Sequence, residues 1–512
     1  MELELRQTAL EAYETCGEIV MTQEESAETI VPDYCPDMAR IIVTEGSAFP
    51  HGQEVRDGRA EISGSVQISV LYTPDGESGV RTLELSLPFT AEGDARALSD
   101  CDELAAETAV EFLEARMLNP RKVLTRCRLS IRLTGWRKTS PRLTADVLAE
   151  EAYKLEKRRE RQKLVLLTRI LRREFQFSDT FSLPSGRPGA VELLSTRVTP
   201  RVAEARMIGN KLMCKGAFTL SALYLTDENA CASETAELPF SQIFDADGVP
   251  EDSAVTVRVT LTGADIQLDG GDPDGRELSV SLYLDALALA YQETELELLR
   301  DLYSTAYETR YDAAPLTLTE SRERQTLRQP VRETLETGVT PDELLSLRVV
   351  CGPVSVADEN GRAILRTVAA VRALYCDEGG VTLVAERRLE IRCDADAPDG
   401  CQVTATADVS EEPRGSVNER GIEVRFAVDF HTEAVRASRT LCVTAVELDE
   451  NAPKDADDAP SLVLRRMGAD ETAWDMAKAC NSSVAAILDA NCVADESELS
   501  RDALILIPRK RG

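Results

Sequence analysis

RAEISGSVQISVLYTPDGE, residues 59–77, is the stretch that decides the fold. Its side chains alternate between apolar and polar, which is typical of a β-strand with one buried face. The tripeptide Pro74-Asp75-Gly76 then indicates a turn. The apolar face carries Ile62, Val66, Ile68, Val70 and Tyr72, and the polar face carries Glu61, Ser63, Ser65, Gln67 and Ser69.

This strand pattern recurs twice along the chain. The second copy is NKLMCKGAFTLSALYLTDEN, residues 210–229, and the third is GRAILRTVAAVRALYCDEGG, residues 361–380. The Leu-Tyr pairs at 71/72, 223/224 and 374/375 are 152 and 151 residues apart. The tripeptide Leu-Pro-Phe at 87–89 recurs at 238–240, and Leu389 holds the corresponding place in the third copy. The alternative to an internal repeat is a coincidence of strand patterns.

The repeat predicts the domain organisation. A chain of 512 residues exceeds the size of one hydrophobic core. Each copy also offers a later strand, CRLSIRL from Cys127, LSVSLYLDAL from Leu278 and IEVRFAVDF from Ile422. We therefore predict a mainly β protein with three tandem sandwich-like modules, residues 1–150, 151–305 and 306–448.

Two connecting segments differ from these modules in composition. LTADVLAEEAYKLEKRRERQKL, residues 143–164, favours a helix, so we predict that the second module begins with a helical connector. Its basic cluster Lys157-Arg158-Arg159 is either a contact for an acidic partner or neighbouring module, or a solvated helix face. Acids, alanines and prolines without periodicity predict an acidic linker over 449–460.

The composition restricts the class of partner and compartment. A net charge of −32 makes the chain a poor binder of nucleic acid. The thirteen cysteines have no C-x-x-C pair and no regular spacing, so we expect reduced thiols in a cytosol and no metal site. The sequence begins without a signal-peptide pattern and has no stretch of about 20 apolar residues, so we expect neither export nor a transmembrane segment.

Catalytic patterns are missing from the sequence. The two histidines, His51 and His431, are far apart and lie in none of the common hydrolase or metalloprotease motifs. GGDPDG, residues 270–275, lacks the ligand spacing of a calcium loop and is typical of a hairpin turn. We therefore predict a protein that is not an enzyme and has no cofactor, with an unrecognised hydrolase as the alternative class.

The last fifty residues have a different pattern. A strand near SLVLRRM, a helix near ETAWDMAKAC, a second helix near SVAAILDAN and a strand near ALILIP predict a βααβ unit over 461–512. Its signature resembles the LysM domain through Thr472, Trp474, Asn491 and the closing Leu506-Ile507-Pro508. We expect its core to contain Trp474, Met476, Ala477, Ile487, Leu488 and Ile507.

The resemblance implies a binding groove formed by two loops. In LysM domains these loops receive N-acetylglucosamine units, and here they would be formed by Asp470, Glu471, Thr472, Ala473, Asn491, Leu499, Arg501 and Asp502. Carboxylates replace glycine at this rim, and a carboxylate rim favours a basic protein over a neutral glycan. The alternative is an intact groove that binds N-acetylglucosamine glycans.

The N-terminal element TIVPDYCPDMARIIVTEG, residues 29–46, resembles the V-P-D-x-x-P-D element that opens a SPOCS domain. Together with the C-terminal LysM pattern, it makes the chain similar to the SipL family of sporulation proteins. The resemblance implies three SPOCS modules and a LysM domain that contacts SpoIVA, an ATPase of the spore coat basement layer. It also implies a cytoplasmic location in the mother cell, at the surface of the forespore or spore coat.

Overall fold

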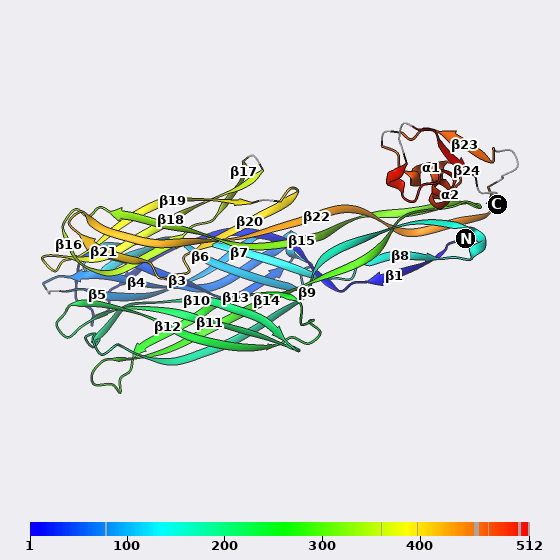
Figure 1. The fold of residues 1–512 in the computed structure, drawn as a ribbon. Helices are drawn as coiled ribbons and strands as arrows, with labels where there is room; N and C mark the ends of the chain where they lie inside the picture. The colour runs from blue at the N-terminus through cyan, green and yellow to red at the C-terminus, as the bar shows by residue number, and fades with distance from the viewer. Residues whose placement is uncertain are drawn as a thin grey trace.

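The computed structural model describes residues 1–76, 79–359, 361–396, 398–454, 460–468, 470–499 and 503–509. The chain is mainly β, as predicted, and its two α-helices in these ranges lie near the C-terminus. Three bodies of strands form one end of the molecule, a narrow stalk of long strands leaves them, and a small unit lies beside the stalk (Figure 1). No helix in the described ranges has the length and apolar character needed to cross a membrane.

The first module is a sandwich of two antiparallel sheets. One sheet has the strand order β3-β4-β5, and the other contains β2, β7 and β6. Alternation along β4 places Ile62, Val66 and Tyr72 in the core between the sheets, against Leu129 and Ile131 of β7. The strands are β2 (Ala12–Ile30), β3 (Met38–Arg56), β4 (Arg59–Pro74), β5 (Arg81–Asp94), β6 (Glu103–Asn119) and β7 (Lys122–Thr139). A short 3₁₀-helix, Arg96–Leu98, follows β5.

The second module repeats this arrangement. Its sheet β10-β11-β12 packs on β13, β14 and β9, and Phe218 and Leu282 meet in the core between them. The strands are β9 (Leu155–Ser182), β10 (Glu192–Ile208), β11 (Lys211–Leu225), β12 (Cys231–Asp245), β13 (Ala254–Leu268) and β14 (Glu277–Ser304). A single residue pair, Tyr13 with Leu167, joins β2 of the first module to β9 of the second.

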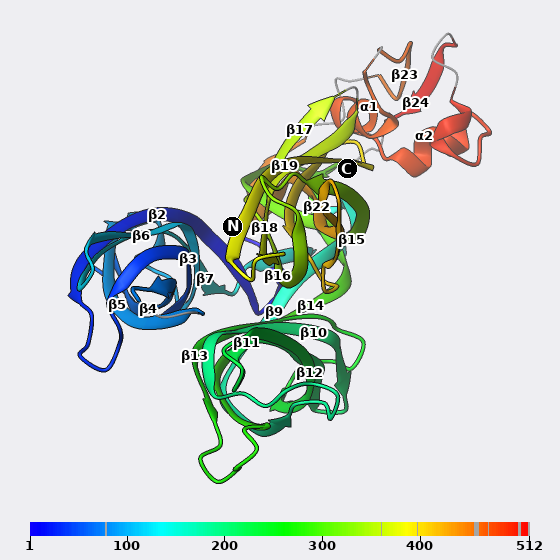
Figure 2. The ribbon, with the colours of Figure 1, turned by 90° about the vertical axis from the view of Figure 1, so that its left-hand side faces the viewer.

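The third module follows the same order of strands. Its sheet contains β16, β18, β19 and β17, and it packs on β15, β22, β20 and β21. The strands are β15 (Tyr307–Leu335), β16 (Pro341–Cys351), β17 (Ser355–Glu359), β18 (Arg362–Asp377), β19 (Thr382–Asp396), β20 (Cys401–Asp408), β21 (Arg414–Asn418) and β22 (Gly421–Pro453). Figure 2 shows the three modules side by side, nearly end-on, in blue, green and yellow.

A β-bulge at equivalent positions brings the three modules together. The ladder register shifts at Ile42 in β3, at Leu194 in β10 and at Leu345 in β16. A bulge re-aims the side chain of the extra residue. These three side chains meet Leu71, Leu223 and Leu374 in one hydrophobic cluster with residues from all three modules. We call this set of six residues the junction cluster.

The predicted helical connector is wrong. Residues 142–148 form β8 (Arg142–Leu148), Glu151–Tyr153 form one 3₁₀ turn, and β9 begins at Leu155. β8 pairs with the N-terminal strand β1 (Glu4–Ala9), and Val147 packs with Leu3 and Leu302 in the stalk. Long-range strand pairing and burial therefore override a composition that favours helix. The basic residue Lys157 contacts Asp146 through an ion pair of 2.9 Å.

The C-terminal unit has the element order β-α-α-β. β23 (Leu462–Arg465) pairs antiparallel with β24 (Ile505–Pro508), and α1 (Ala473–Ala479), α2 (Val484–Ala490) and a 3₁₀ turn, Glu496–Glu498, lie between them. The predicted linker begins later than expected, because β22 continues to Pro453 and pairs there with Tyr307. Residues 455–459 of that linker lie outside the described residues. Each of the thirteen cysteines has a free thiol.

Candidate interaction surface of the C-terminal unit

Helix α1 begins with a capping box. The Thr472 hydroxyl accepts a hydrogen bond from the Asp475 backbone N–H at 3.2 Å, and the Asp475 carboxylate accepts one from the Thr472 N–H at 2.9 Å. These two bonds satisfy N–H groups that the helix itself leaves free. Thr472, predicted as a groove residue, therefore sets where the helix starts.

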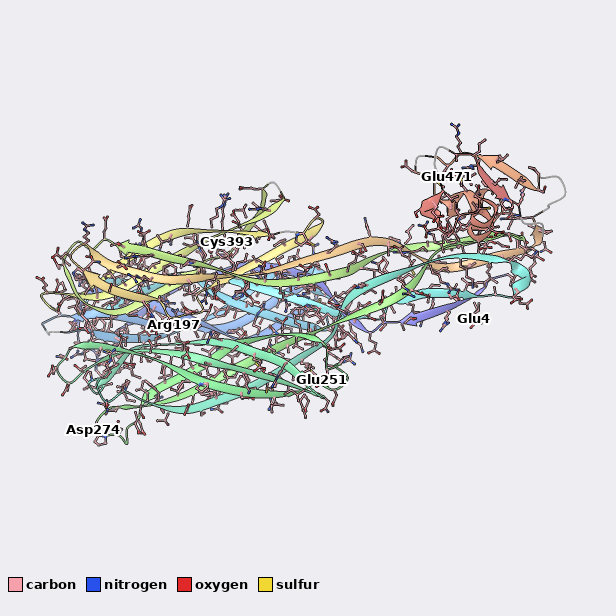
Figure 3. The ribbon with its side chains drawn as sticks, in the orientation of Figure 1. Glu4, Arg197, Glu251, Asp274, Cys393 and Glu471 are labelled. Atoms are coloured by element: carbon pink, nitrogen blue, oxygen red, sulfur yellow. The ribbon has the colours of Figure 1, made fainter. Side chains whose placement is uncertain are left out.

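Glu471 also has a structural partner. Its carboxylate accepts a hydrogen bond from the Gly468 N–H at 3.0 Å and pairs with the Arg465 guanidinium. The Gly468 hydrogen bond, and next the Arg465 side chain, hold the pKa of Glu471 below its ordinary value. Glu471 thus ties β23 to the start of α1. Figure 3 shows its position in the unit.

Two expected groove residues lie inside the unit. Ala473 is 1% exposed and Leu499 is 8% exposed, and both belong to the core cluster that contains Met476, Ala477 and Ile487. The other expected core residues, Trp474 and Ile507, are buried, and Leu488 packs against them. The residues predicted to form the groove are therefore not all exposed, because some of them are buried in the core of the unit.

The Asn491 side chain joins α2 to the closing strand. Its amide nitrogen donates to the carbonyls of Ile487 and Leu506, both at 2.7 Å, and its amide oxygen accepts from the Leu506 N–H at 2.9 Å. All of these partners are backbone groups. The side chain is thus occupied by folding contacts, and it leaves little capacity for a ligand.

The unit docks on the stalk through Trp474. The indole N–H donates to Asp301 Oδ2 at 2.7 Å, and the ring packs edge-on against Tyr303 at a centroid distance of 5.0 Å. Lys478, one helical turn further on, donates to Asp301 Oδ1 at 2.6 Å. A partly buried indole usually finds a hydrogen-bond partner, and here that partner lies 173 residues away on β14.

Further contacts extend this docking interface. The Tyr303 hydroxyl donates to the Ser482 carbonyl at 2.9 Å, and the Asn481 amide donates to the Thr305 carbonyl at 2.8 Å. Burial works to raise the pKa of Asp301, but hydrogen bonds from Lys478 and Trp474 hold it below its ordinary value. Asp301 is therefore a charged acceptor at the centre of the interface. Sequence patterns did not indicate it.

Acidic side chains remain on the exposed part of the unit. They include Asp470, Asp489, Asp495, Glu496 and Glu498, and we call these five residues the acidic set. Asp495 also accepts the Ser497 N–H at 2.8 Å and caps the 3₁₀ turn. The predicted groove residues Arg501 and Asp502 lie outside the described residues. Within the described ranges, no three His, Cys, Asp or Glu side chains gather as metal ligands would.

The segments that precede β3 and β10, residues 31–37 and 183–189, fold in the same way. We call each of them the entry to its module. The Cys35 N–H donates to the Pro32 carbonyl at 2.9 Å, and the Arg187 N–H donates to the Pro184 carbonyl at 2.9 Å. The Tyr72 hydroxyl then donates to Pro36 O at 3.2 Å, and the Tyr224 hydroxyl donates to Pro188 O at 3.3 Å. Both tyrosines are fully buried.

An arginine closes each of these two entries. Arg121 donates to the carbonyls of Val31 and Cys35 at 2.9 and 2.7 Å, and Arg276 donates to those of Leu183 and Arg187 at 3.2 and 2.9 Å. The acceptors lie 152 residues apart in each case. The VPDYCPD segment thus has a structural counterpart in LPSGRPG, residues 183–189, which the sequence analysis missed. The shared spacing of the two prolines was the available signal.

A comparison with known protein families found a match for one segment of the chain. Residues 190–269 match the family described as SipL, SPOCS domain. The matched segment contains β10, β11, β12 and β13, which carry Tyr224 and the bulge at Leu194. A search of curated proteins found no match. The domain supports an association with sporulation and with protein interactions there.

Proposed function

We propose that this protein is a non-enzymatic scaffold in endospore formation. The three modules would form repeated SPOCS domains, and the C-terminal unit would be a LysM domain that binds a protein. That partner would be a SpoIVA-like ATPase of the coat basement layer, and the scaffold would join it to the forespore surface from the mother-cell cytoplasm. The SPOCS match over residues 190–269 carries this proposal.

The geometry of the first module supports extending the match beyond the second. β3, β4 and β5 follow the order of β10, β11 and β12, and the entry contacts of Tyr72 and Arg121 correspond to those of Tyr224 and Arg276. Equivalent backbone contacts at positions 152 residues apart are expected of a tandem repeat.

The acidic set supports a protein partner for the C-terminal unit. Its exposed carboxylates gain little from a neutral glycan, but they would steer a basic surface and pair with its Arg or Lys side chains. Asp470 and Glu496 have no ion-pair partner among the described residues, so both are available for such contacts.

A charge-reversal experiment tests this surface. Full-length protein with Asp470→Lys and Glu496→Lys is compared with the wild type in affinity purification from sporulating cells, and the recovered ATPase is quantified. We expect recovery to fall at least tenfold. The matched control carries Glu228→Lys and Asp274→Lys, two exposed carboxylates of the second module, with the same change in net charge. Equal recovery by both variants would contradict the assigned surface.

The second candidate is a peptidoglycan-binding protein. The LysM-like order of elements in the C-terminal unit favours it. Titration of the full-length protein with N-acetylglucosamine oligomers distinguishes the two, because we expect little or no binding. Low-micromolar affinity that survives Asp470→Lys would support the glycan ligand instead.

A further inference from the structure

The three modules line a partly open cavity of about 380 Å³ next to the junction cluster. Its lining includes Val43 and Ser69 of the first module, Ser195 and Thr219 of the second, and Leu347 of the third. Ligand sites in proteins begin at about 300 Å³, so the volume suffices for a small molecule. The equivalent strands β3, β10 and β16 all contribute to this lining. Their shared bulges bring these strands together at the junction cluster.

Charged residues occupy equivalent positions around this cavity. Glu45, Arg197 and Arg348 lie at the same place in β3, β10 and β16, 152 and 151 residues apart. The residues opposite them in the ladders are Ser69, Ser221 and Arg372. One carboxylate therefore faces three guanidinium groups. Figure 3 shows Arg197 in the part of the body that lies far from the C-terminal unit.

Glu45 does not satisfy all three arginines. Its carboxylate pairs with Arg348 at 3.1 Å and lies 3.8 Å from Arg372, and it accepts a hydrogen bond from the Ser195 hydroxyl at 3.2 Å. Arg372 has a second partner in Glu386 at the outer edge. Even with Glu386 included, the cations outnumber the carboxylates by three to two.

Two of the guanidinium groups keep hydrogen-bond donors without an acceptor. Arg348 Nε is buried and has no acceptor. Among the residues that the structure describes, Arg197 has no hydrogen-bonded partner, although its side chain lines the cavity. Leaving a buried charged donor unpaired costs stability, so these groups are suited to receive an acceptor from outside the chain.

The electrostatics of the cluster agree with an excess of positive charge. Burial, and next the neighbouring Arg348, lower the pKa of Arg197 to about 10. Burial works to raise the pKa of Glu45, but Arg348 and then Arg197 hold it below its ordinary value. The arginines thus destabilise one another's charge, and a bound anion would relieve that repulsion.

Four further carboxylates also line the cavity. Three of them have side-chain partners outside it, since Glu234 pairs with Arg187, Glu411 pairs with Arg328, and Asp408 lies 3.1 Å from the His431 imidazole. Glu412 alone has no such partner among the described residues. The unbalanced positive charge therefore lies at Arg197 and Arg348, and the other lining carboxylates disfavour long polyanions.

We propose that this cavity binds a small phosphate dianion, with Arg197 and Arg348 as its main ligands and Ser221 beside them. Arginine forks match the geometry of phosphate oxygens, and such contacts are stronger where water is excluded. The ligand is either inorganic phosphate or the phosphate group of a small ester. Because its ligands come from different modules, the bound anion would also join them.

Calorimetric titration of the full-length protein tests this site. We expect saturable binding of inorganic phosphate, and we expect none of chloride at the same ionic strength. Arg197→Gln should weaken the binding about tenfold or more, the effect of losing a charge-assisted hydrogen bond. The matched control is Arg206→Gln, an exposed arginine on the same strand β10, which should leave the affinity unchanged.

A gain-of-binding variant makes the test independent of any loss of folding. Glu45→Gln removes the internal carboxylate that competes for Arg348, so its affinity for phosphate should rise several-fold. Titration with glycerol phosphate in parallel distinguishes the ester from the free ion as the preferred form. The proposal is overturned if the wild type binds no phosphate saturably, or if Glu45→Gln binds it no more tightly.

Discussion

Leu71 and Tyr72 are consecutive residues whose side chains belong to different hydrophobic clusters. Tyr72 lies in the core of the first module, whereas Leu71 lies in the junction cluster between the modules. The alternation of a strand puts neighbouring side chains on opposite faces of the sheet. The pairs Leu223-Tyr224 and Leu374-Tyr375 have the same division. One dipeptide therefore specifies both the inside of a module and its contact with the others.

Leu223→Ala should destabilise the association of the modules. Leu223 is 7% exposed and lies in the junction cluster, so its truncation leaves a cavity there. We expect the free energy of unfolding to fall by about 2–5 kcal/mol, as for buried leucines in general. Urea denaturation measures this. Leu118→Ala, at a residue 49% exposed, is the control and should change the midpoint little. Equal effects of both substitutions would rule out the role given to the junction cluster.

Gly216→Ala should destabilise the second module. Gly216 lies opposite Phe240 in the ladder, and an added Cβ would come within 2.7 Å of the Phe240 ring and also meet the Arg201 carbonyl. We expect a loss of about 1–3 kcal/mol from overpacking. Thermal unfolding measures it against Gly186→Ala, where a Cβ meets no atom within 4 Å. An unchanged melting temperature for Gly216→Ala would show that β11 can move away from Phe240.

Asp301→Asn should loosen the C-terminal unit from the stalk. The substitution keeps an acceptor for the Trp474 indole but removes the charge that pairs with Lys478. Because the Lys478 side chain is 38% exposed, the pair contributes about 1 kcal/mol. Acrylamide quenching of Trp474 fluorescence, in a Trp136→Phe background, should increase. Asp312→Asn, an exposed carboxylate on β15, should leave the quenching as it was.

His431 should titrate above its ordinary range. Its Nε2 lies 3.1 Å from Asp408, and this hydrogen bond, although opposed by burial, raises the pKa of the imidazole. A raised pKa means that the stabilisation is complete below the ordinary value of 6.5 and is lost as the pH rises through the folded value. Asp408→Asn should lower the pKa of His431.

Proton NMR can follow this titration directly, because the chain has only two histidines. A His51→Gln variant assigns the two signals. Asp399→Asn provides a control carboxylate that does not contact the imidazole. If the His431 signal titrates at the same pH in the Asp408→Asn protein, the Asp408 carboxylate does not stabilise the protonated imidazole.

Periodic strands were the part of the fold that the sequence predicted. The alternation in residues 59–77 and its two copies predicted β4, β11 and β18, with Tyr72, Tyr224 and Tyr375 buried. The β-α-α-β order of the C-terminal unit was also predictable, because its short helices have caps such as Thr472 and an apolar face. Both are local signals.

Long-range contacts explain what the sequence did not reveal. Residues 143–164 have a helical composition, yet Val147 and Leu164 are buried in strands whose partners lie far along the chain. An arginine such as Arg197, seen only in the sequence, is typical of a surface position. The bulges shared by the modules bring its strand next to the strand that carries Glu45. Asn491 and Leu499 were assigned to a groove by resemblance, whereas packing puts them against or within the core.

The strand β14 contributes to hydrophobic clusters from the second module to the C-terminal unit. Leu282 near its start lies in the second module, and Tyr303 near its end lies in the core of the C-terminal unit. Between them β14 pairs with β9 from Glu277 to Ser304, a length of about 90 Å at roughly 3.3 Å per residue. The inter-strand hydrogen bonds are perpendicular to the strands. A pull along the stalk that reaches β14 through the docking contacts of Asp301 would therefore load these bonds together in shear.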